Sequence, residues 1–172
     1  MSDPLPNLRW WLRGLVAFAI VVALGLGITV PEIVTFGITD HQAAESAAQV
    51  NEIQTQWRQG GVRNFAIAAM IGDLIFIGIY SWGSWLAGRS FMAMSGPVRM
   101  IGSIVAPAAL VFAITDYIET ILQVIQLLQD AGSDWMAAIA ASMGPIKAIS
   151  WITTFGGVLL AIAIRRFRTT AA

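Results

Sequence analysis

The chain has 172 residues, of which 57% are hydrophobic and only 12% are charged. Because a typical soluble domain has about 25% charged residues, this composition argues against a water-soluble fold and favours a membrane protein. The net charge is zero and cysteine is absent, so we expect no nucleic-acid partner, no disulfide and no thiolate metal site.

Four apolar stretches are long enough to cross a bilayer. These stretches are residues 15–36, 64–86, 98–128 and 135–164. Each exceeds the roughly 20 residues that span a hydrocarbon core of about 30 Å. In lipid every backbone amide must be satisfied within its own segment, which requires helices. The sequence therefore predicts an all-α, polytopic integral membrane protein, a four-transmembrane-helix bundle forming a single membrane domain over residues 1–172.

The first stretch has a second interpretation. Arg9 and Arg13 precede its apolar run, as basic residues do in a cleaved signal peptide. The run is long for such a peptide, and no clear small-residue cleavage site follows it closely. We therefore interpret the stretch as a retained anchor.

The arginines divide unequally between the two ends of these helices. If the N-terminus is cytoplasmic, seven arginines fall on that side and only Arg58 and Arg63 fall on the other. The seven are Arg9, Arg13, Arg89, Arg99, Arg165, Arg166 and Arg168. By the positive-inside rule, we expect both termini on the cytoplasmic side of the membrane.

The longer outer connection contains a pattern typical of an amphipathic helix over residues 40–59. Its mostly apolar positions recur at helical spacing, with Asp40 available as an N-cap and Gly60-Gly61 as a stop signal. We expect this helix to lie on the outer membrane face or over the mouth of the bundle. Whether it closes the mouth as a lid or only packs against it stays open.

Four charged residues fall at similar depths inside the apolar stretches. Counted from the outer helix ends at about 1.5 Å per residue, they lie roughly 14 to 18 Å in. The four are Asp73, Asp116, Glu119 and Lys147. Each would cost about 2.5–3.5 kcal/mol if it faced lipid near the bilayer centre. We therefore expect them to face one another inside the bundle, where charged residues indicate a functional site by default.

Helical spacing adds three neighbours to these charges. Gln123 shares a face with Glu119, Tyr80 lies two turns beyond Asp73, and Trp151 lies one turn beyond Lys147. The predicted ligand or proton site is thus Asp73, Asp116, Glu119, Lys147, Tyr80, Gln123 and Trp151.

The charges of this set do not balance, because three carboxylates face one ammonium. A shared proton or a bound cation would resolve the imbalance, but the lysine repels metal ions, so we expect no metal. We also expect no cofactor, since the only histidine, His41, lies in the outer connection and cannot ligate haem within the bundle. The competing interpretation is a structural ion pair that fixes helix register. It requires one acid for Lys147, whereas three are present.

Three short motifs of the sequence match a pattern found in other proteins. Tyr80 follows Asp73 by seven residues, Asp116 and Glu119 begin a D-x-x-E motif, and Trp151 closely follows Lys147. In this pattern, over about residues 60–160, the chain resembles a set of small bacterial four-helix membrane proteins. Their motif continues as D-x-x-E-N, whereas Thr120 stands here in place of the Asn, which puts an amide-specific role in doubt. The resemblance implies a four-helix fold, a charged cluster and a location in a bacterial inner membrane, but no reaction.

Three functions fit these observations. We expect a protein that binds a small or amphiphilic, lipophilic molecule, with proton-coupled transport as one form of that activity. The first alternative is a non-catalytic accessory subunit of a larger membrane complex, bound to other membrane-protein subunits. The second is an isomerase-like enzyme acting on a lipid, with Asp73 or Glu119 as acid or base. No nucleophile motif or phosphate-binding loop supports the enzyme, so we assign no catalytic residue.

Overall fold

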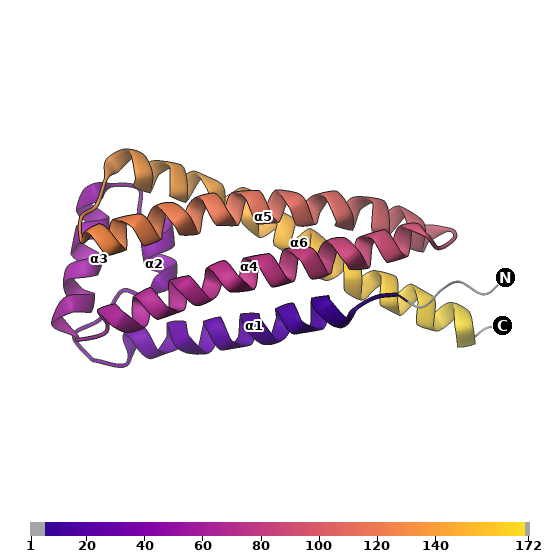
Figure 1. Cartoon of the computed structure of the whole chain (residues 1–172), viewed down its shortest axis with the longest axis horizontal. Helices are drawn as coiled ribbons and strands as arrows, with labels where there is room; N and C mark the ends of the chain where they lie inside the picture. The colour runs from indigo at the N-terminus through magenta and orange to yellow at the C-terminus, as the bar shows by residue number, and fades with distance from the viewer. Residues whose placement is uncertain (1–5, 171–172) are drawn as a thin grey trace.

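The computed structural model of the protein describes residues 6–170, which form helices and connections without strands (Figure 1). The long helices are α1 (Arg9–Leu26), α4 (Arg63–Met92), α5 (Pro97–Gln129) and α6 (Asp134–Thr170). The short helices are α2 (Ile38–Ala43) and α3 (Ala47–Gln59), and a 3-10 turn, η1 (Gly27–Thr29), extends α1. Four helical segments are long and apolar enough to cross a membrane, in agreement with the sequence prediction.

Two boundaries differ from the expected ones for identifiable reasons. The first long helix covers Arg9 to Thr29 instead of ending near Phe36. Pro31 follows its end, and a proline has no backbone N–H with which to continue the helical hydrogen bonds. The expected outer helix over residues 40–59 is two helices. Ala44 is extended, and the Ser46 hydroxyl caps α3 by accepting a hydrogen bond from the Gln49 amide.

The long helices pack in chain order, with α1 on α4, α4 on α5 and α5 on α6, while α6 crosses behind α4 (Figure 1). Glycines let the helix backbones approach closely along these helix–helix contacts, which we call seams. A Cβ on Gly102 would lie 2.6 Å from the Gly88 carbonyl oxygen on the neighbouring helix, and one on Gly83 would collide with the backbone of Trp11. Helices α1 and α6 do not form such a seam, and they diverge toward the end that holds α2 and α3.

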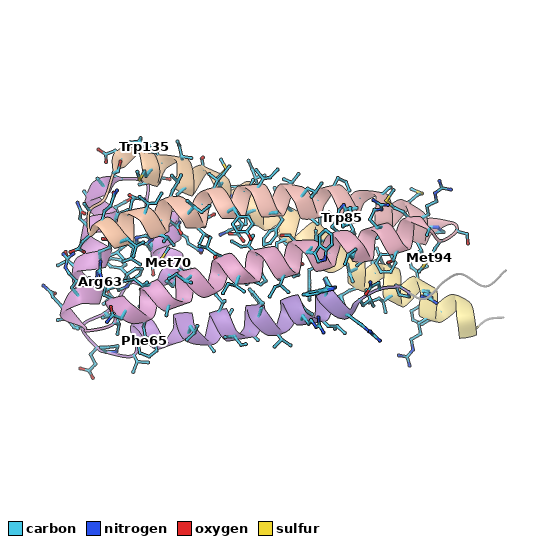
Figure 2. The ribbon with its side chains drawn as sticks, in the orientation of Figure 1. Arg63, Phe65, Met70, Trp85, Met94 and Trp135 are labelled. Atoms are coloured by element: carbon cyan, nitrogen blue, oxygen red, sulfur yellow. The ribbon has the colours of Figure 1, made fainter. Side chains whose placement is uncertain are left out.

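Buried apolar side chains form two clusters at different positions along the bundle axis. One, around Tyr80, Phe91 and Phe112, fills the half of the bundle farther from α3. The other, around Trp57 and Leu127, lies beneath α3. Figure 2 shows the two ends, with Arg63 and Trp135 near α3 and Trp85 and Met94 toward the opposite end. The predicted charged site falls between the two clusters, where α4, α5 and α6 come together.

Candidate functional site

Lys147 on α6 is held by two carboxylates of α5. Its Nζ lies 2.6 Å from Glu119 Oε1 and 3.3 Å from Asp116 Oδ1. Asp116 and Glu119 are three residues apart and therefore point toward α6 from the same face of α5. Their side chains are 4% and 1% exposed, and that of Lys147 is 19% exposed. The predicted buried ion pair between the third and fourth long helices is thus confirmed.

Asp73 on α4 occupies a different position in the cluster. Its Oδ2 accepts a hydrogen bond from the Thr120 hydroxyl over 3.0 Å. Among the described residues, the ion pairs of Lys147 are those with Asp116 and Glu119, and Asp73 has none. Thr120 therefore connects α5 to the unpaired acid.

A cavity of about 630 Å³ lies beside these charges. Asp73, Asp116 and Lys147 line one part of it, whereas Glu119 lies behind them and does not reach it. Most of the remaining wall is apolar. Its members on α1 are Phe18, Val21, Val22, Gly25 and Leu26; those on α4 are Ala69, Met70 and Phe76; and the rest include Phe112, Ala148, Trp151 and Ile152. A largely apolar pocket with a few convergent polar groups is the usual form of a small-molecule site.

Four of these wall residues form an aromatic floor, defined as Phe18, Phe76, Phe112 and Trp151. On α4, α5 and α6 the aromatic residue lies one turn beyond a charged one, on the side away from α3. Ring centroids are 5.3 Å apart for Phe18 and Phe76 and 5.7 Å apart for Phe18 and Trp151. The charged groups thus lie directly above a layer of contacting rings.

The other end of the cavity is covered by the segment that contains α2. Ile38, Thr39 and Asp40 line the cavity from this segment, and the Asp40 carboxylate accepts a hydrogen bond from the Gly37 amide over 2.7 Å. Two aromatic residues attach α2 to α3. His41 stacks on Trp57 with ring centroids 5.0 Å apart, and the indole N–H of Trp57 donates to the Phe36 carbonyl oxygen over 2.8 Å. We call residues 35–43 the cap.

Three residues of the predicted site lie outside the cavity wall, namely Glu119, Tyr80 and Gln123. The Tyr80 hydroxyl is 3.0 Å from Thr154 Oγ1, on the far side of the aromatic floor. Gln123 is 1% exposed, and neither polar atom of its amide has a hydrogen bond of normal geometry. Trp151 does line the cavity, together with Asp73, Asp116 and Lys147. The structure therefore separates the seven predicted residues into wall residues and residues that support the wall.

Sequence reasoning did not find the contributions of α1 and the cap. Phe18, Val22, Gly25 and Thr29 recur at helical spacing on one side of the first apolar stretch. That spacing was a usable signal for a common face, although apolar residues on a lipid-facing side give the same pattern. Within residues 6–170, no three His, Asp or Glu side chains are grouped in a way that could hold a metal ion.

Comparison of the chain with protein-family models, curated proteins and solved structures gave no match.

The ion-paired cluster gives a first testable prediction. Lys147→Met leaves two buried carboxylates without their cation, so we expect the free energy of unfolding to fall by about 3–5 kcal/mol. Adding Glu119→Gln removes one of these carboxylates and should recover part of the loss. Thermal or denaturant unfolding in detergent measures this non-additivity. Arg99→Met, at an exposed position on α5, is the control for loss of a basic residue. Additive effects would contradict the ion-pair interpretation.

The cap gives a second prediction. Burial lowers the pKa of His41 from 6.5 to about 4, because the charged imidazolium would lose its hydration. Between these values the unfolded chain binds a proton that the folded protein does not, so stability should decrease as pH falls from about 6.5 to 4. We expect His41→Gln to have a shallower decrease of melting temperature over this range. Parallel curves for the two proteins would show that His41 is not the titrating group.

Proposed function

We propose that the protein is a multi-pass protein of the bacterial inner membrane, with both termini in the cytoplasm, that binds a small amphiphilic ligand in the cavity. The four long apolar helices support the membrane location. Large apolar side chains on their outer surfaces, such as Val16, Ile114 and Ile149, are more than half exposed and suit contact with lipid. The excess of arginines at one end of the bundle supports the orientation.

The observation that carries the ligand-binding proposal is the position of Asp73. Its carboxylate lines an apolar cavity without an ion pair among the described residues. A charge in such a place is costly unless something compensates it. Lys147 acts on Asp73 through space, but its ion pairs are with Asp116 and Glu119, so it compensates Asp73 only in part. A ligand in the cavity, or a proton bound together with it, would supply the compensation, which also connects binding to proton uptake.

The accessory-subunit alternative explains only part of the arrangement. A structural ion pair between α5 and α6 requires Lys147, Asp116 and Glu119. It requires neither Asp73 nor a cavity above an aromatic floor. We therefore favour ligand binding, in which the ion pair builds one wall of the site. An isomerase-like activity would use the same carboxylates, and no observation favours it over binding alone.

Filling the cavity tests this proposal. A Cβ on Gly25 meets one neighbouring atom, Ile38 Cγ1, at 3.8 Å, so Gly25→Phe can direct its ring into the cavity without breaking a helix seam. Native mass spectrometry of the protein purified in mild detergent should detect a retained amphiphile on the wild type and none on this variant, at similar melting temperatures. Gly144→Ala, where an added Cβ meets nothing within 4 Å, is the matched control.

The competing functions give different results in the same experiment. A stoichiometric polypeptide that co-purifies with both the wild type and Gly25→Phe, with no bound amphiphile on either, would support the accessory subunit and contradict ligand binding. Asp73→Asn separates the roles of the charges, because an amide preserves volume while removing the charge. We expect this variant to fold with near-normal stability and to lose the amphiphile.

The orientation can be tested with single cysteines, since the chain contains none. Ala93 lies between α4 and α5, and Ala131 lies between α5 and α6, and both are exposed. In intact bacterial cells a membrane-impermeant thiol reagent should label Ala131→Cys from the periplasmic side. Ala93→Cys should react only after the inner membrane is permeabilised. The opposite pattern would invert the proposed topology.

A further inference from the structure

We infer that the ligand of this cavity is a cationic amphiphile, an alkyl chain carrying a substituted ammonium group. The ammonium lies beside Asp73 and above the aromatic floor. This inference rests on the proposed function and adds the chemical class of the ligand. Three independent features of the cavity support it, namely its charge, its rings and its apolar wall.

The first feature is the charge of the wall. Four charged groups line the cavity, of which Asp40 belongs to the cap and Asp73, Asp116 and Lys147 to the cluster. Lys147 and Asp116 face each other 3.3 Å apart, and Glu119 adds a second carboxylate to Lys147 from behind. With Asp73, three carboxylates surround one ammonium. An anionic ligand would add to the negative charge, and a neutral one would leave it unchanged. A cation beside Asp73 reduces it.

The second feature is the aromatic floor. Phe18, Phe76, Phe112 and Trp151 all contact the same cavity that Asp73 lines. Aromatic faces attract cations through their quadrupole, and clustered rings are a known means of binding substituted ammonium groups. Phe76 lies one turn from Asp73 on α4, so an ammonium placed at the carboxylate also lies near a ring. A neutral or anionic head group would gain nothing from this combination.

The same features disfavour a metal ion in this place. Hard cations such as Ca²⁺ require about six to eight oxygen ligands, whereas the cavity beside Asp73 is bounded mainly by aliphatic and aromatic side chains. The Lys147 ammonium is also part of the wall and would repel a dication. An organic ammonium spreads its charge over methyl or methylene groups and tolerates apolar neighbours.

The third feature is the apolar wall that leads away from the charges. On α1 the lining residues extend from Phe18 to Thr29, which is about 16 Å along the helix axis. Ala69 and Met70 continue this wall on α4. In the cap, Ile38 continues it beside the polar residues Thr35, Thr39, Asp40 and Gln42. An alkyl chain attached to an ammonium at Asp73 can therefore lie along α1.

Three water-soluble probes with the same alkyl chain test the charge preference. These are hexyltrimethylammonium, 1-hexanol and hexanesulfonate, titrated into the purified full chain in maltoside micelles, with binding followed by calorimetry. We expect the ammonium probe to bind at least about tenfold more tightly than hexanol, with hexanesulfonate the weakest. Asp73→Asn should abolish this preference, and Phe18→Leu should reduce it. Glu52→Gln, which removes an exposed carboxylate on α3, should leave it unchanged.

The possible outcomes separate the two proposals. Equal binding of all three probes, lost in Gly25→Phe, would retain the amphiphile site and overturn its cationic specificity. Tightest binding of hexanesulfonate would also overturn it and would identify Lys147 as the recognition group. No binding of any probe, together with no retained amphiphile in native mass spectrometry, would overturn both proposals. The comparison among probes uses the wild-type protein, so it decides the inference even if Asp73→Asn does not fold.

Discussion

The pairing of Lys147 with two carboxylates of α5 is the interaction on which the arrangement of the long helices depends. A charged group in an apolar environment costs several kcal/mol unless a partner and hydrogen bonds compensate it. Helices α5 and α6 must therefore adopt the rotation and register that bring Lys147 to Asp116 and Glu119. Helix α4 is tied to the same level by the hydrogen bond from Thr120 to Asp73. The position of the cavity follows, because its charged wall is built from these three helices.

The charged layer and the aromatic layer have different physical roles. Removing Lys147 leaves two buried carboxylates without a cation, whereas removing one carboxylate leaves Lys147 paired with the other. Asp73 shares their depth without sharing an ion pair. The rings below are held by packing, which tolerates small changes of shape. A site that combines both layers has a fixed charged wall and a more adaptable floor.

Much of this arrangement could be predicted from the sequence, and the reason is energetic. Charges in a membrane-length helix must meet inside the bundle, so chain position alone was enough to predict that Lys147 pairs with Asp116 or Glu119. The hydrogen bond from Thr120 to Asp73 could not be predicted, because it depends on how α4 and α5 are turned toward each other. The wall formed by α1 gave no distinctive signal, since Phe18 and Gly25 would look the same facing lipid. The break between α2 and α3 depends on a local hydrogen bond, which the Ser46 hydroxyl accepts at the start of α3.

The position of α1 has a consequence for how the cavity can fill. All four charged residues of the cluster lie on α4, α5 and α6, while α1 supplies only apolar or aromatic wall residues up to Leu26. Displacing α1 from the cavity would therefore exchange contacts between apolar side chains for contacts with lipid chains, which are similarly apolar. The ion pairs would stay intact during this movement. The three charged helices thus hold the charged wall together, and α1 supplies the part of the wall that carries no charge.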